Sequence, residues 1–224
     1  MRELDTNLYV AEQPLKFLGF AIGARMTAIR LDDGSLFIHS PIRLTSELRG
    51  GLERLGPVKF LIAPNRFHHL FIADYLSAYK ASQAWCAPGL DAKRQDIRFT
   101  GRLDDDAPAG WAGQIDQVFF RPLRALNEVV FFHRLSRTLM FTDLLFNVVR
   151  SDSVATRIAL TLDGGFGHPT VPRTFRLGLW MRRAEARATI DRVLSWDFDR
   201  VILAHGDVVE TEGKAVVQRA WSFL

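Results

Sequence analysis

The stretch at residues 128–147, EVVFFHRLSRTLMFTDLLFN, predicts two buried strands followed by a carboxylate. Residues 128–133 are rich in Val and Phe, as expected of a strand that is covered on both faces. After a short, mostly polar break, residues 138–141 resume as a second apolar strand that ends on Thr142 and Asp143. A carboxylate there costs free energy unless a helix N-terminus, an arginine or a metal ion compensates it. Taken alone, Asp143 is best explained as a cap of the turn after the strand.

Two further apolar segments end on histidines. Residues 200–204, RVILA, precede His205, and residues 58–64, VKFLIAP, precede a loop that contains His68 and His69. The ends of buried strands are where sites assemble in layered α/β folds. Three such segments, each followed by His or Asp, therefore predict a functional site.

The sequence resembles the metallo-β-lactamase fold superfamily in two of these segments. The phrase SRTLMFTDLLF is similar to the strand and loop whose Asp binds or bridges metal in that superfamily, and VILAHGD is similar to its final strand, whose His is a ligand. The order along the chain matches, and the resemblance spans nearly all of it. It points to an uncharacterised branch, a domain of unknown function with a His-His pair in a degenerate first metal motif. The resemblance implies an α/β (α+β) fold, a four-layer αββα sandwich that residues 1–224 form as a single domain.

The first metal motif of the superfamily, H-x-H-x-D-H, lies at the start of a helix. Placing its last His on His69 puts His68 on its Asp, and the two earlier ligand positions then fall on Pro64 and Arg66. The third motif, which supplies another His ligand, falls near Arg124. Because neither Pro nor Arg binds a metal, the resemblance implies that one of the two metal sites of the superfamily has been lost.

The second metal site of the superfamily keeps donor residues throughout. The resemblance implies one divalent metal, Zn²⁺ first and Fe²⁺ or Mn²⁺ as alternatives, for which three His and one Asp are suitable. Adjacent residues on a helix point about 100° apart, so both histidines of the pair can bind one ion only if they lie in the loop. We rank His69 before His68. The predicted metal ligands are His68, His69, Asp143 and His205, and Asp143 is also the predicted catalytic residue.

Five other residues are predicted to support this site or to contact substrate. Arg66 and Arg124 stand where the first metal would lie, in a position to bind a substrate anion. Glu128, at the start of a buried strand, needs a partner, for which these two arginines are candidates. His133 ends a strand at a turn, where an exposed histidine without a role is an equally good explanation. His168 lies in a glycine-rich loop expected at the mouth of the site, where contact with substrate is the weaker alternative.

These features lead to two hypotheses of different classes. The first is a metal-dependent hydrolase with a mononuclear site that activates water against a small-molecule ester, lactone, thioester or phosphodiester. The alternative is a non-catalytic, metal-free protein of the same fold that binds a small molecule or a protein partner. Nucleic-acid processing, a role of some members of the superfamily, ranks third because the sequence lacks an aromatic and basic recognition motif.

Length and composition fit one globular domain. The 224 residues are 48% hydrophobic, which allows one substantial core. The formal net charge of +4 comes mostly from arginines spread along the chain, so nucleic acid is not an expected partner. The single cysteine, Cys86, fits a reducing compartment because it cannot form an internal disulfide. Neither a signal peptide nor a membrane-spanning run is recognisable, and we expect a cytoplasmic protein whose oligomeric state the sequence leaves open.

Overall fold

The N-terminal half of the chain forms a seven-stranded sheet. The computed structural model describes all residues from Met1 to Leu224. In spatial order, the strands are β1 (Arg2–Asp5), β2 (Leu8–Gln13), β5 (Ala24–Arg30), β6 (Leu36–His39), β7 (Val58–Ala63), β8 (Gln83–Cys86) and β9 (Gly101–Arg102). The pairs from β1 to β6 are antiparallel, whereas those from β6 to β9 are parallel. The loop after the parallel strand β7 carries His68.

Helices α1 (Ser46–Leu55) and α2 (Ile72–Ala78) cover the outer face of this sheet, and the short α3 (Leu90–Lys93) follows β8. Leu52 of α1 and Tyr75 of α2 pack with Ile38 of the sheet in one hydrophobic cluster. The start of α1 is fixed by Thr45, whose side chain accepts a hydrogen bond from the backbone N–H of Leu48 at 3.1 Å.

The second sheet has four strands and brings two predicted site residues to one edge. Its strands, in spatial order, are β10 (Ile115–Phe120), β11 (Glu128–His133), β12 (Thr138–Phe141) and β13 (Arg200–Leu203). β12 and β13 are parallel, with Phe141 opposite Leu203. Because parallel strands end at the same edge of a sheet, Asp143 and His205, each two residues beyond its strand, lie close together.

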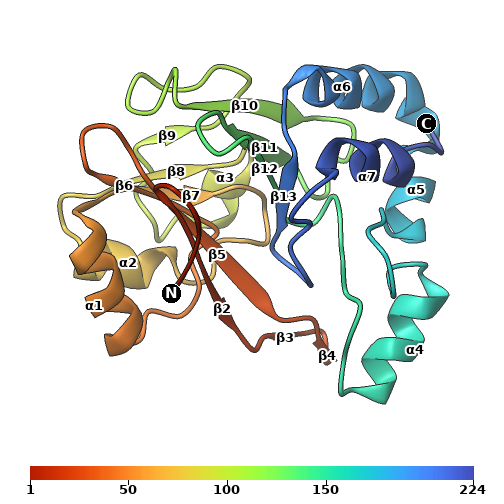
Figure 1. Ribbon diagram of the computed structural model, residues 1–224, viewed down its shortest axis with the longest axis horizontal. Helices are drawn as coiled ribbons and strands as arrows, with labels where there is room; N and C mark the ends of the chain where they lie inside the picture. Colours follow the sequence, from red (N-terminus) through yellow and green to blue (C-terminus); the bar gives the residue numbers. More distant parts are fainter.

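The connection from β12 to β13 carries most of the helices of the second half. It contains α4 (Val154–Leu162), α5 (Arg173–Leu179), the 3-10 helix η1 (Trp180–Arg182) and α6 (Arg183–Ser195), and α7 (Gly213–Ala220) follows β13. Ile190 of α6 and Val217 of α7 pack with Leu139 and Val201 on the outer face of the sheet. α4 lies beside the small hairpin of β3 (Lys16–Phe17) and β4 (Phe20–Ala21) (Figure 1).

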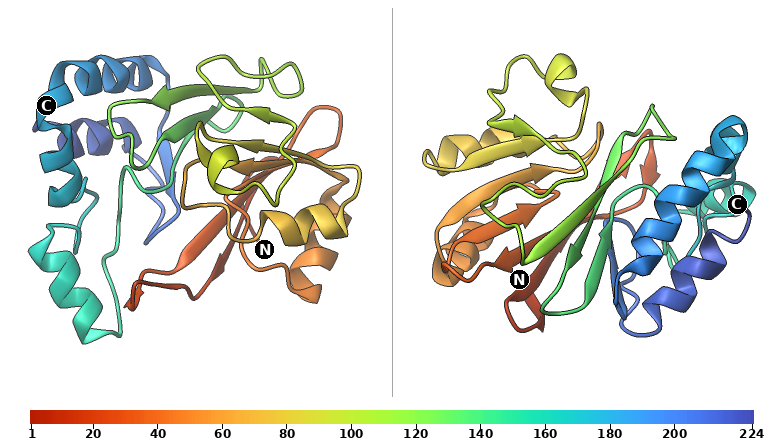
Figure 2. Two further views of the ribbon diagram at one scale, coloured as in Figure 1. Left: turned by 180° about the vertical axis from the view of Figure 1, so that it is seen from behind. Right: turned by 90° about the horizontal axis from the view of Figure 1, so that it is seen from above.

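The two sheets pack face to face, and helices cover both outer faces (Figure 2). The interior between the sheets is centred on Trp111, whose ring meets those of Phe37, Phe60 and Trp85 edge to face. Ile202 of the second sheet belongs to the same cluster. This order of layers confirms the α/β four-layer αββα sandwich predicted from the sequence. None of the helices combines the length and apolar character needed to cross a membrane.

Candidate metal centre

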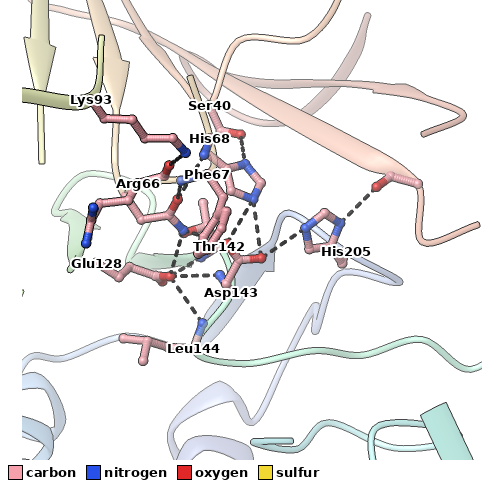
Figure 3. A network of polar contacts seen from close by, with 12 residues as sticks. Ser40, Arg66, Phe67, His68, Lys93, Glu128, Thr142, Asp143, Leu144 and His205 are labelled. Atoms are coloured by element: carbon pink, nitrogen blue, oxygen red, sulfur yellow. Dashed lines mark hydrogen bonds and ion pairs between the residues drawn. The ribbon is translucent and has the colours of Figure 1, made fainter. Parts of the chain in front are cut away.

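Three strand ends place His68, Asp143 and His205 around one point between the two sheets (Figure 3). One donor atom from each lies within 4.8 Å of the others. The Nε2 atom of His205 is 3.2 Å from Oδ1 of Asp143, and the Nε2 atom of His68 is 3.4 Å from the same oxygen. All three side chains are largely withdrawn from solvent. The arrangement therefore offers two imidazoles and one carboxylate to a single ion.

Asn65, which directly follows the Pro64 that ends the apolar run, joins His68 to Asp143. Its amide nitrogen donates to Oδ2 of Asp143 at 2.7 Å and to the hydroxyl of Thr142 at 2.9 Å. Its amide oxygen accepts from the backbone N–H groups of Phe67 and His68 at 2.7 and 2.9 Å. Asn65 is fully buried, and these hydrogen bonds give both donors and the acceptor of its side-chain amide partners within the protein. Asn65 was not among the predicted site residues, because its contact with Asp143 joins positions that are 78 residues apart.

Glu128 holds the loop that carries Asp143. Its buried carboxylate accepts hydrogen bonds from the backbone N–H groups of Thr142 at 2.7 Å, Asp143 at 2.8 Å and Leu144 at 3.1 Å. The partners of Glu128 are thus these backbone groups and the side-chain amide of Asn65, which donates at 3.3 Å, and not the arginines suggested as candidates from the sequence. Burial and, after it, the charge of Asp143 raise the pKa of Glu128. Burial would also raise the pKa of Asp143, but His68 and His205 outweigh it and lower that pKa well below its usual range.

The ring of His205 is oriented by a backbone carbonyl. Its Nδ1 atom lies 2.8 Å from the carbonyl oxygen of Gly23 and must donate to it, because a carbonyl can only accept. A neutral His205 therefore presents an unprotonated Nε2 to a carboxylate oxygen. Two acceptor atoms at that distance repel each other unless a proton or a metal ion lies between them. A histidine whose other nitrogen donates to a carbonyl is typical of metal sites, so these residues fit a metal ion.

His68 is oriented on its other side by Ser40. Its Nδ1 atom lies 2.6 Å from the hydroxyl oxygen of Ser40, the residue after β6. Burial disfavours the charged imidazole, but the carboxylates of Asp143 and Glu128 outweigh burial and raise the pKa of His68. Ser40 was not among the predicted site residues, because its contact with His68 joins two different loops.

His69 is the one predicted ligand that the structure does not bring into this group. Its Nδ1 atom accepts a hydrogen bond from Arg94 at 2.8 Å. Burial, together with the charges of Lys93 and Arg94, lowers the pKa of His69 to about 4. The loop after β7 turns around Asn65, and α2 begins only at Ile72, so the two adjacent histidines point in different directions. The structure thus brings His68, and not the higher-ranked His69, together with Asp143 and His205.

The remaining predicted residues lie away from the three donors. Arg66 directs its guanidinium away from His205 (Figure 3), and Arg124 is exposed. His133 is at the opposite end of β11 from Glu128, about 17 Å along the strand, where its Nδ1 atom is 2.7 Å from the hydroxyl of Ser136. His168 is exposed. None of these four residues lines the cavity of about 660 Å³ that opens over the site.

Solved structures with the same fold include three that show the range of the likeness. The DIM-1 metallo-β-lactamase exposed to ceftazidime is 14% identical, with a TM-score of 0.66 over 99% of this chain and 95% of that chain. A metal-soaked Flv1 flavodiiron core from Synechocystis is 12% identical, with a TM-score of 0.66 over 97% of this chain and 58% of that chain. A metallo-β-lactamase from Pontibacter korlensis is 12% identical, with a TM-score of 0.61 over 99% and 96%. At these identities the likeness shows the fold alone.

A family model matches most of the chain. A family model described as a domain of unknown function, DUF4336, matches residues 5–161, which include His68 and Asp143. Comparison with curated proteins gives no match. Because the family model covers more than half of the sequence, the chain belongs to the family DUF4336, a domain of unknown function, and its fold is that of the metallo-β-lactamases.

Proposed function

We propose that this chain is a metal-dependent hydrolase that holds one divalent ion, with Zn²⁺ as the first candidate, between His68, Asp143 and His205. Three protein ligands leave a further position for water, as in catalytic zinc sites. An ion bound there would lower the pKa of that water and so supply the nucleophile for hydrolysis of a small-molecule ester, lactone or thioester or of a phosphodiester.

The contact between His205 and Asp143 is the observation that carries this proposal. The carbonyl of Gly23 accepts a hydrogen bond from Nδ1 of His205, so in a neutral His205 the Nε2 lone pair faces a carboxylate oxygen 3.2 Å away. A proton or a metal ion between the two atoms relieves their repulsion, and the Nε2 atom of His68, at 3.4 Å from the same oxygen, completes a donor set for a metal ion. The chemistry of the donor set thus supports a single metal ion.

The other residues of the site would hold the donors in position. Asn65 binds Oδ2 of Asp143 and leaves Oδ1 directed at the two histidines. Glu128 fixes the backbone of the Asp143 loop, and Ser40 fixes the ring of His68. With one carboxylate oxygen restrained, Asp143 can both bind the ion and accept a hydrogen bond from the attacking water, which is the role that we propose for it.

Metal content measured by elemental mass spectrometry tests the proposal. We expect about one Zn²⁺, Fe²⁺ or Mn²⁺ per chain in protein purified without a histidine tag, and loss of that metal in His205→Ala. The matched control is His69→Ala, which removes a buried histidine that is not in the donor group and is expected to keep the metal. Protein that takes up no metal after reconstitution with each of the three ions would contradict the proposal.

A metal-free binding protein of the same fold is the second candidate. The specific observation in its favour is that a protonated His68, with Nε2 at 3.4 Å from both oxygens of Asp143, would satisfy the carboxylate without an ion. This candidate predicts that a chelator changes neither stability nor ligand binding, whereas a metal-dependent hydrolase loses its metal and its turnover together.

A further inference from the structure

The cavity over the candidate metal centre has mainly apolar walls. It has a volume of about 660 Å³, and His68, Asp143 and His205 all border it. Its walls come from the β3–β4 hairpin, from α4 and α5 and from the loop after β7, and 16 of its 25 lining residues are hydrophobic. A cavity of this size and lining is typical of small-molecule sites that enclose most of an apolar ligand.

The charges around this cavity have one sign. Apart from the histidines, its charged lining residues are Asp143 and Asp163, and no lysine or arginine lines it, although the chain contains 29 of them. Arg66 and Arg124, the two residues expected to bind a substrate anion, lie outside the lining. Away from His68, Asp143 and His205, an anionic group carried into this cavity would therefore lose its water without gaining a cationic partner from the walls.

The entrance of the cavity carries two apolar side chains that are exposed to solvent. Leu18, at the turn of the hairpin, is 81% exposed, and Leu162, near the end of α4, is 72% exposed. Both border the cavity. The hairpin and α4 are joined by the hydrogen bond from the Ala21 N–H to the hydroxyl of Thr156, at 2.9 Å. These two elements thus place Leu18 and Leu162 where the body of an apolar ligand would cover them.

We propose that the cavity selects an uncharged substrate with an apolar body, such as the ester or lactone of an aliphatic acyl chain, and rejects substrates that carry a carboxylate or phosphate on that body. The part of this proposal that concerns hydrolysis rests on the function proposed above, whereas the selectivity for uncharged ligands rests on the cavity alone. Each methylene group buried in the cavity is expected to tighten binding about fourfold.

A matched pair of esters tests this selectivity. Methyl octanoate and monomethyl suberate carry the same methyl ester on the same aliphatic chain, which ends in a methyl group in the first and in a carboxylate in the second. Isothermal titration calorimetry on chelated protein, which has no metal ion to bind the carboxylate, is expected to show binding of methyl octanoate that is at least about tenfold tighter. Equal affinity for the two esters, or tighter binding of monomethyl suberate, would overturn the proposal.

Two exposed leucines give a matched pair of variants. Leu18→Asp adds an anionic group at the entrance and is expected to weaken the binding of methyl octanoate at least about fivefold. Leu177→Asp is the control, because Leu177 is 79% exposed but does not line the cavity. An unchanged affinity in Leu18→Asp, or an equal loss in both variants, would count against the cavity as the binding site.

Hydrolysis of the two esters, followed by release of methanol, separates this inference from the proposed function. If metal-loaded protein binds methyl octanoate selectively but does not hydrolyse it, the selectivity of the cavity is supported and the proposed hydrolase function is contradicted. If turnover depends on the metal but kcat/KM is equal for the two esters, the proposed hydrolase function is supported and the selectivity of the cavity is contradicted.

Discussion

At the scale of single residues, the position of Asp143 depends on neighbours that are not themselves metal donors. Asn65 binds one of its carboxylate oxygens, and Glu128 binds its backbone N–H. Both neighbours are fully buried, so water cannot replace their hydrogen bonds to Asp143 if these are lost. The position of Asp143 beside His68 and His205 therefore depends on at least two buried residues.

Asn65→Ala is expected to destabilise the metal-free protein by about 3 kcal/mol, because it leaves the N–H groups of Phe67 and His68 and one oxygen of Asp143 without their partner. Urea denaturation followed by circular dichroism measures this change. The exposed amide of Gln95 provides the control, since Gln95→Ala is expected to change stability by less than about 0.5 kcal/mol. A similar stability for the two variants would show that Asn65 does not hold the loop.

At the scale of elements, the parallel pair β12 and β13 brings Asp143 and His205 together, and the turn after β13 allows little variation. Gly206 has a φ of +87°. A Cβ atom at this residue would overlap the carbonyl oxygen of Asn147, which belongs to the chain that follows Asp143. Any side chain there would push the two loops apart, so the turn requires glycine for both its backbone angle and its close approach.

The contact between the β3–β4 hairpin and α4 is a second element-scale feature that can be tested. Thr156→Val keeps the shape of a fully buried side chain but removes the acceptor of the Ala21 N–H. We expect a loss of about 1 kcal/mol and, as a result, an amide hydrogen exchange at Ala21 that is about fivefold faster.

Hydrogen exchange measured by nuclear magnetic resonance gives the rate for Ala21. Thr161→Val, an exposed change on the same helix, serves as the control and should leave that rate unaltered. If Ala21 exchanges equally fast in both variants, the hairpin does not depend on α4 for its position.

The sequence predicted the strands better than the loops between them. Asp143 and His205 were predicted to lie together because each follows an apolar strand and strand ends assemble at one edge in a layered fold, and the structure brings them together. The sequence could not show which of His68 and His69 lies beside Asp143, because this depends on where the loop turns and on the start of α2 at Ile72. The contacts of Asn65 with Asp143 and of Ser40 with His68 join residues far apart in the chain, and no local pattern reports them.

At the scale of the whole molecule, the donor group joins the two sheets. His68 follows a strand of the first sheet, whereas Asp143 and His205 follow strands of the second. Buried Arg25 of the first sheet also donates to the carbonyl oxygen of Leu203 in the second sheet. A metal ion bound at this junction would stabilise the packing of one half of the chain against the other.

Removal of the metal is therefore expected to lower the unfolding temperature. An ion present at 100 times its dissociation constant adds about 2.7 kcal/mol of stability, which corresponds to about 5 to 10 °C for a domain of this length. Differential scanning calorimetry with and without a chelator measures the shift. In His205→Ala the chelator should have no effect, and an equal shift in that variant would show that the ion binds elsewhere.

The hydrogen bond between His205 and Gly23 joins residues separated by 182 positions, and that between Arg25 and Leu203 joins residues separated by 178. Contacts between such distant residues form slowly, because the chain loses the entropy of a very long loop before they contribute any stability. During synthesis on the ribosome, the first sheet can begin to pair long before His205 has been translated. We therefore expect the three side chains to come together late in folding, so that a metal ion bound by them would be captured by a chain that is already nearly native rather than serve as its nucleus.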